Sequence, residues 1–152
     1  LFKRHGVLNE VEIQARHEIM LENYIMKVQI EARVMGDLAL NHIIPTAIIY
    51  QNKLIQNANG LKGLGINADD IIETIEELSK HVSIIKKLTN EMVGERKKVN
   101  KMEDSRVRAI AYCDQVKAKH FDQIRYSVDK LELLVDDEDW PLVKYRELLF
   151  LR

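Results

Sequence analysis

Five histidines are the residues of this sequence best suited to metal or proton chemistry, because imidazole binds metals and titrates near neutral pH. Helical proteins build di-iron centres from paired Glu-x-x-His motifs. The positions three residues before the histidines hold no glutamate; they are Phe2, Gln14, Ala39, Leu78 and Lys117. His17 and Glu18 begin like the zinc-binding motif His-Glu-x-x-His, but Leu21 occupies the position of its second histidine. The sequence therefore predicts no metal site of either kind.

The single cysteine and the glycine-rich loop also lack the surroundings that catalysis or nucleotide binding requires. Cys113 and His120 are about two helical turns apart, whereas activation of a nucleophile needs contact near ~3 Å. We expect Cys113 to be a buried, inert thiol. The glycines of residues 60–65 follow neither the GxGxxG nor the GxxxxGK[ST] spacing, and no strand precedes them. We therefore predict a turn between helices here, and no catalytic or cofactor-binding residue in the chain.

The element that must position most of the remaining sequence is a long apolar stretch between His17 and Asn57. One set of its apolar residues recurs at helical spacing: Leu21, Tyr24, Val28, Met35 and Ile49. A second set lies on other faces of the same helix: Ile25, Ile30, Val34, Ile44, Ile48 and Ile55. A helix that is apolar around most of its circumference is normally buried on several sides. We therefore expect a central helix that the rest of the chain surrounds.

Polar residues trapped inside this stretch are spaced so that they can satisfy one another. Arg33 and Asp37 are four residues apart, as are Asp37 and Asn41, and side chains at this spacing face each other on a helix. For His42, a hydrogen-bonded structural role beside Pro45 and a role at an interface are both open. Pro45 removes a backbone donor and clashes with the carbonyl of Asn41, which predicts a kink or a break between these two residues.

Capping and turn signals divide the chain into separate helices. Asn9 followed by Glu12 is a capping-box pattern, and the first helix can extend from there to about Asn59, where Asn and Gly residues favour a stop. The second helix is expected to begin at an Asn67 cap. Apolar character is lost within residues 94–104, which predicts the next connection, although a helix that continues through this region is the alternative.

The second and third helices each have an apolar side. In the second helix it consists of Ile71, Ile75, Leu78, Val82, Ile85 and Met92. In the third, which an acidic run stops at about Val135, it consists of Val107, Ile110, Phe121, Ile124, Val128, Leu131 and Val135. A short final helix is predicted to begin at Pro141, with Leu142, Tyr145 and Leu149 on its inner side. The sequence thus predicts an all-α fold, an elongated antiparallel helical bundle of three long helices plus a short C-terminal helix, in one domain of residues 1–152.

The composition excludes several classes of protein. Lys and Arg number 23 against 24 Asp and Glu, so the basic excess of a nucleic-acid-binding protein is absent. Even the apolar stretch contains Glu, Arg or Asp every few residues, which argues against a membrane span. The first residues are charged and lack the apolar region of a signal peptide, and one cysteine provides no disulfide framework. We therefore expect a cytoplasmic protein without nucleic-acid or membrane partners.

Two ordered groups of residues, far apart in the chain, resemble a known family. The first comprises Arg16, Glu18, Glu22, Tyr24, Gln29, Glu31, Arg33, Asp37, the run Asn41-His42-Ile43-Ile44-Pro45-Thr46-Ala47, and Tyr50-Gln51. The second is Trp140-Pro141-Leu142-Val143-Lys144-Tyr145-Arg146-Glu147-Leu148-Leu149-Phe150. Together they resemble the start and the end of the C-terminal helical domain of type III glutamine synthetase. Val143 departs from the pattern, since that family has a second proline there.

This resemblance implies a part of an enzyme that joins glutamate and ammonia, with ATP and Mg or Mn, in a ring-based homo-oligomer. The family's catalytic, nucleotide and metal residues lie upstream, in sheet-containing domains, so no catalytic, cofactor or metal residue is assigned here. A chain that does not begin with Met agrees with a fragment of a longer polypeptide. We expect a structural and assembly domain whose partners are the upstream catalytic domain and other subunits. Its candidate interface or structural residues are Arg33, Asp37, Asn41, His42, Pro45, Tyr50, Trp140 and Tyr145.

A second function from another class is also compatible with the residues. The apolar sides of the helices could bind a partner helix in a groove, as in a stand-alone helical-bundle protein–protein interaction module. Trp140 and Tyr145 fit both hypotheses, because aromatic residues anchor interfaces and also dock a terminal helix onto its own domain. The fragment alone is expected to have no ligase activity under either hypothesis.

Overall fold

The computed structural model describes residues 7–149, except for the side chains of Tyr145 and Arg146. Its helices are α1 (Glu10–Leu38), α2 (Ile44–Gly63), α3 (Asp69–Val99), α4 (Ser105–Ala111), α5 (Lys119–Leu134) and α6 (Tyr145–Leu149). Two π-helical segments join consecutive α-helices: η2 (Ala39–Ile43) and η3 (Tyr112–Ala118). Within the described residues there is no strand, so the predicted all-α fold is confirmed.

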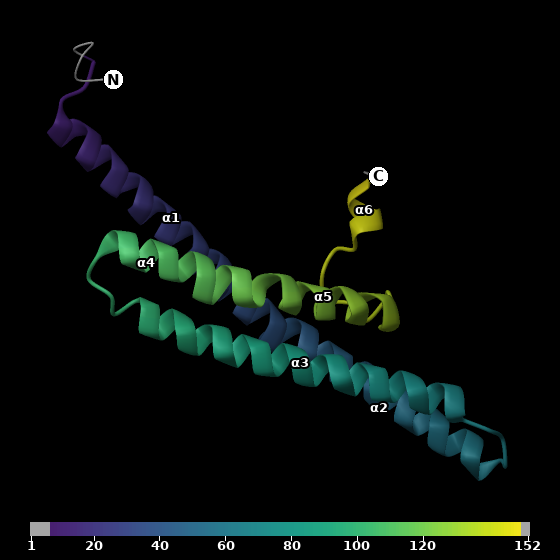
Figure 1. Cartoon of the computed structure of the whole chain (residues 1–152). Helices are drawn as coiled ribbons and strands as arrows, with labels where there is room; N and C mark the ends of the chain where they lie inside the picture. The colour runs from purple at the N-terminus through teal and green to yellow at the C-terminus, as the bar shows by residue number, and fades with distance from the viewer. Residues whose placement is uncertain (1–6, 150–152) are drawn as a thin grey trace.

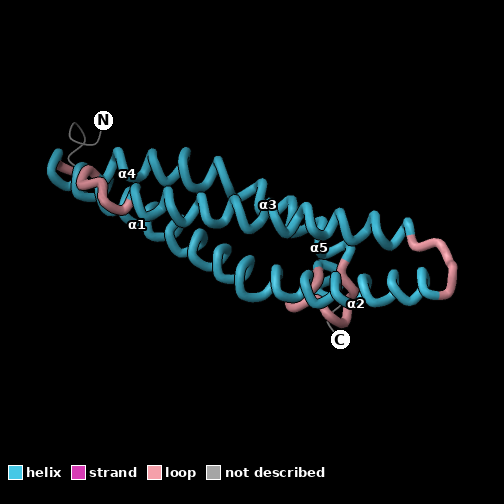
Figure 2. Tube along the Cα trace, turned by 90° about the horizontal axis from the view of Figure 1, so that it is seen from below, coloured by secondary structure: helices cyan, strands magenta, loops and turns pink. Residues whose placement is uncertain are grey.

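The helices form three long rods that run side by side in alternating directions (Figures 1 and 2). The first rod is α1, η2 and α2; the second is α3; the third is α4, η3 and α5. The first turns of α1 project beyond the other rods, and α6 points away from the bundle (Figure 1). All side chains of residues 9–20 are accordingly exposed. The elongated antiparallel bundle of three long helices and a short one is therefore confirmed.

The first rod begins as predicted and ends later than predicted. Asn9 Oδ1 accepts a hydrogen bond from the Glu12 N–H at 2.8 Å, and Glu12 Oε2 accepts one from the Asn9 N–H at 2.7 Å, which completes the capping box. The expected stop near Asn59 is wrong, because α2 continues to Gly63. Gly65, with φ of 75°, supplies the left-handed residue, and the Ile66 N–H bonds the Leu61 carbonyl in the pattern of a Schellman motif.

At Pro45 the rod is neither broken nor regular. Proline has no N–H to donate to the carbonyl of Asn41, so the regular α-helical bond is absent there. The preceding residues form the wider turn of η2, in which the Ile44 N–H bonds the Ala39 carbonyl five residues back. The predicted disturbance between Asn41 and Pro45 is thus a π-helical turn, and the break is excluded.

The second rod agrees closely with its predicted apolar side. Leu78, Ile85 and Met92 are fully buried, and Thr89 fills the remaining position of the same side. Asn67 does not cap α3 in the usual geometry, but its Oδ1 accepts a hydrogen bond from the Asp69 N–H at 2.9 Å. The connection to α4 is confirmed and spans residues 100–104, so a helix that continues through this region is wrong.

In the third rod, the predicted apolar side is correct in α5 and wrong in α4. Val107 and Ile110 are exposed, whereas Ala109, Tyr112 and Val116 are buried. The cause is η3, because a π-helical segment has more residues per turn than an α-helix. Counting back from Phe121 in steps of about 3.6 residues therefore reaches the wrong face of the helix.

The C-terminal segment departs from the predicted short helix. Residues 141–144 are not helical, so a helix start at Pro141 is wrong, and α6 begins at Tyr145. Glu147 Oε2 accepts a hydrogen bond from the Lys144 N–H at 3.1 Å, which fixes the start of α6 after Lys144. Leu142 is half-buried as expected, whereas Leu149 is exposed, contrary to the prediction.

Candidate functional site

The first rod places most of the predicted interface residues at the surface. Arg33, Asp37, Asn41, His42 and Pro45 are all exposed, so the polar residues of this stretch are not trapped inside the domain. The pairing of Asp37 with Asn41 is confirmed, since Asn41 Nδ2 donates to Asp37 Oδ1 at 2.6 Å. His42 is exposed on the first rod, and its role at an interface stays a prediction.

The predicted aromatic residues lie on the bundle itself. Trp140 is buried, and Tyr50 packs against the same apolar cluster, which includes Ile44, Leu78 and Leu131. Trp140 therefore docks the C-terminal segment onto its own domain. The side chain of Tyr145 lies outside the described residues.

The first rod carries a large exposed apolar surface. The expectation of a central helix buried on several sides by its own chain is wrong, because the other two rods cover only one side. The exposed apolar residues are Val11, Ile13, Ile19, Met20, Met26, Ile30, Val34, Ile48, Ile49 and Ile55. Clusters of exposed apolar residues on this scale mark surfaces that contact a partner.

Four of these residues share one face of α1, which we call the outer stripe: Ile19, Met26, Ile30 and Val34. With 3.6 residues per turn, the outer stripe falls on the side of α1 opposite to the buried Val28 and Ala32. Ile30 and Val34 are 54% and 51% exposed. The outer stripe thus makes α1 apolar on two opposite sides, of which the domain covers one.

A groove between α1 and α5 adjoins the outer stripe. We call it the α1–α5 groove; it has a volume of about 610 Å³. Its lining consists of Ile30, Glu31, Val34, Met35, Leu38, Ala39, Ile43, Phe121, Ile124, Arg125, Val128, Asp129, Glu132, Trp140, Leu142 and Val143. The apolar members form its floor and walls, and four charged residues stand among them. Ile30 and Val34 belong to both surfaces, so the groove and the outer stripe are one continuous apolar region.

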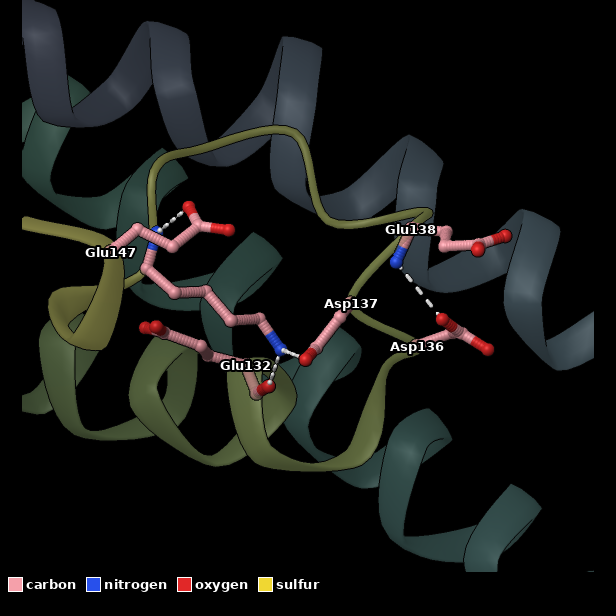
Figure 3. A network of polar contacts seen from close by, with 6 residues as sticks. Glu132, Asp136, Asp137, Glu138 and Glu147 are labelled. Atoms are coloured by element: carbon pink, nitrogen blue, oxygen red, sulfur yellow. Dashed lines mark hydrogen bonds and ion pairs between the residues drawn. The ribbon is translucent and has the colours of Figure 1, made fainter. Parts of the chain in front are cut away.

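Polar contacts fix the C-terminal segment, which lines part of the α1–α5 groove, to the end of α5 (Figure 3). Lys144 Nζ donates to the Glu132 carbonyl at 2.9 Å and forms an ion pair with Asp137. Lys53 Nζ of α2 lies 2.8 Å from Asp139 Oδ1, which ties the same segment to the first rod. These contacts hold Trp140 and Leu142 in the wall of the groove.

A more polar groove of about 530 Å³ lies between α3 and α5 and contains His81. The His81 ring is buried, and its Nδ1 has no hydrogen-bond partner among the described residues. It stands edge-on to the ring of Tyr126, with centroids 6.5 Å apart. His81 was not among the predicted residues, although its place three residues after Leu78 on the buried side of α3 could have identified it.

His81 should make the stability of the domain depend on pH. Burial lowers the pKa of His81 below its usual value of 6.5; Lys80 and Lys130 lower it further, and Glu77 opposes them. The unfolded chain therefore binds this proton first as the pH falls. The stabilisation by neutral His81 is complete above pH ~6.5 and is lost as the pH falls through the native pKa. In urea titrations between pH 7.5 and 5.5, His81→Gln should lose less stability than the wild type; equal losses would contradict this assignment.

Two tyrosines of the bundle, Tyr24 and Tyr112, make polar contacts that serve structure. Burial, and then a hydrogen bond with Cys113, raise the pKa of Tyr24 to about 12. Cys113 is exposed, which corrects the expected buried thiol. The Tyr112 hydroxyl donates to Asn100 Oδ1 at 2.6 Å, and burial raises the pKa of Tyr112. These contacts join the third rod to α1 and to the loop after α3.

Residues 7–149 contain neither a metal-binding cluster nor a membrane-spanning helix. No group of three or more His, Cys, Asp or Glu side chains is placed there to hold a metal ion. None of the described helices combines the length and the apolar character needed to cross a bilayer. The exposed apolar region formed by the outer stripe and the α1–α5 groove is the candidate functional site, because exposed apolar surfaces mark contacts with a partner.

Comparison with known proteins assigns the chain to a family. Residues 1–62 match the family model of the glutamine synthetase C-terminal domain. A glutamine synthetase of Bacteroides fragilis (strain YCH46) is 45% identical over 150 residues, which are 95% of this chain and 20% of the relative. The type-3 glutamine synthetase of Dictyostelium discoideum is 26% identical over 158 residues, covering 100% of this chain and 21% of that protein. The chain thus spans about a fifth of the length of these relatives, and it belongs to the family of glutamine synthetase C-terminal domains.

Proposed function

We propose that this chain is the structural and assembly domain of a glutamine synthetase, the enzyme that joins ammonia to glutamate with ATP. The observation that carries the proposal is the apolar region on α1, which the domain leaves exposed, because neighbouring exposed apolar residues mark surfaces that contact a partner. The domain supplies no catalytic residue. ATP and Mg or Mn bind in the catalytic part of the complete cytoplasmic enzyme.

In this proposal, the partners of the domain are the catalytic domain of the same polypeptide and other subunits of a ring-based homo-oligomer. Arg33, Asp37, Asn41 and His42 are exposed on the first rod and would contact these partners. The alternative, a stand-alone helical-bundle interaction module, would use the same surface. The length of the relatives supports the first proposal, because each carries about four-fifths of its sequence outside the matched region.

Two measurements on the complete enzyme and on this chain test the proposal. Deletion of the domain from the complete enzyme should lower the mass of the particle in native mass spectrometry or light scattering. The isolated chain should form no glutamine from glutamate, ammonia and ATP. A truncated enzyme with unchanged mass and full activity would refute the assembly role, and turnover by the isolated chain would refute the absence of catalytic residues.

A further inference from the structure

The α1–α5 groove lies between two helices of the bundle, at a position that a fourth helix could fill. α1 packs against α4, η3 and α3, whereas α5 packs mainly against α3. On the side of α1 and α5 that faces away from α3, the only part of residues 7–149 that enters the groove is the short C-terminal segment, with Trp140, Leu142 and Val143. The remaining length of the groove is bordered by two helices and is open to solvent. A fourth helix in this position would complete a bundle of the usual kind.

Both walls of the groove repeat at helical spacing. On the α1 side, Ile30, Val34 and Leu38 are separated by four residues each. On the α5 side, Phe121, Ile124 and Val128 are separated by three and four residues. Such rows form ridges, and another helix packs its own ridges between them at an axial distance of about 8–10 Å. The groove therefore fits a helix with apolar residues at positions i, i+3 or i+4, and i+7.

The charged residues of the groove indicate which charges its occupant should carry. Three of the four charged residues in the lining are acidic: Glu31, Asp129 and Glu132. The single basic residue, Arg125, lies 3.8 Å from Asp129, and Lys117 lies 3.5 Å from Glu31. The bond from Lys144 goes to the carbonyl of Glu132 and not to its carboxylate. With both ion pairs counted, the carboxylate of Glu132 remains as an acidic excess on the α5 side of the groove. This excess favours an occupant with Lys or Arg along one edge.

We propose that the α1–α5 groove holds an amphipathic helix from the part of the polypeptide outside residues 1–152, with a basic edge beside its apolar face. This inference rests on the proposed function, because it takes the occupant from the same enzyme. The relatives, about five times longer than this chain, contain ample sequence to supply it. A second copy of this domain fits less well. The projecting end of α1 carries four acidic residues, Glu10, Glu12, Glu18 and Glu22, and one arginine, Arg16. If this end of a second copy entered the groove, its carboxylates would face the acidic residues of the groove and repel them.

Photo-crosslinking in the complete enzyme identifies the occupant. A photoreactive benzoylphenylalanine replaces Val34 in the groove or, as the matched control, Val107 on α4; the two valines are 51% and 53% exposed. From position 34 we expect crosslinks to a peptide outside residues 1–152 that has apolar residues at helical spacing and flanking Lys or Arg. From position 107 this peptide should be absent. Crosslinks only within residues 1–152, to a second copy of this domain, or to a peptide without basic residues would each overturn the proposal.

Charge reversal tests the basic edge separately. Glu31→Lys with Asp129→Lys should lower the crosslink yield from position 34 at least about three-fold, because the edges would then repel. Glu73→Lys with Glu91→Lys adds the same charge on exposed positions of α3 and should leave the yield unchanged. An equal effect of both pairs would overturn the proposal. The particle mass, measured on the same samples, separates the two hypotheses: an intact oligomer without the expected crosslink refutes the helix in the groove and leaves the assembly role standing.

Discussion

Replacing Ile30 and Val34 together with aspartate should raise the dissociation constant for assembly of the complete enzyme by about a hundred-fold or more. Each substitution removes an apolar contact and introduces a carboxylate that the partner would have to bury without a counter-charge. Leaving a buried polar group unpaired costs about 1–3 kcal/mol, and each 1.4 kcal/mol changes a dissociation constant about ten-fold. The fold of the domain should change little, because both side chains are about half exposed in it.

The domain itself offers a closely matched control for this experiment. Val107 and Ile110 of α4 are 53% and 54% exposed, the same residue types at nearly the same exposure as Val34 and Ile30. Val107→Asp with Ile110→Asp therefore adds equal charge and removes equal apolar area, on a surface outside the α1–α5 groove. Dilution series followed by native mass spectrometry should show dissociation only for the α1 pair. Equal dissociation of both pairs, or of neither, would contradict a specific docking surface on α1.

The sequence was sufficient to predict where the helices lie, because capping and apolar periodicity are local signals. Asn9 with Glu12 fixes the start of α1, and Leu78, Ile85 and Met92 share the buried side of α3 as expected. The stop of α2 was misplaced because several Asn and Gly residues near its end could each have ended it. Only the backbone shows that Gly65 adopts the left-handed conformation.

The parts that could not be predicted depend on the π-helical segments and on the other rods. Periodicity in steps of about 3.6 residues assumes a regular α-helix, and η3 shifts the phase of α4 relative to α5. The periodicity therefore predicts Val107 and Ile110 on the buried side of α4, whereas both are exposed.

The surface of α1 shows a different limit of sequence patterns. The sequence indicated correctly that Ile30 and Val34 are apolar on a second face, but it could not show that no rod of this domain covers that face.

Truncation of Leu78 to alanine should destabilise the domain by about 2.7–5 kcal/mol, the range of buried leucine-to-alanine substitutions. Leu78 is 0% exposed and belongs to the apolar cluster that joins α2, α3 and α5. The surrounding side chains come from three rods, so they cannot collapse into the space without moving a helix. Urea unfolding followed by circular dichroism at 222 nm measures the change.

The control is a leucine of the same bundle that contributes no burial. Leu133 of α5 is 80% exposed, so Leu133→Ala should change the free energy of unfolding by no more than about 0.5 kcal/mol. Both variants lose the same atoms and have the same intrinsic preference for helix, so the difference between them isolates the packing of Leu78. The slope of the free energy against urea should be the same for both, because the unfolded chains expose similar surfaces. A small effect at Leu78 would mean that the three rods do not share one core.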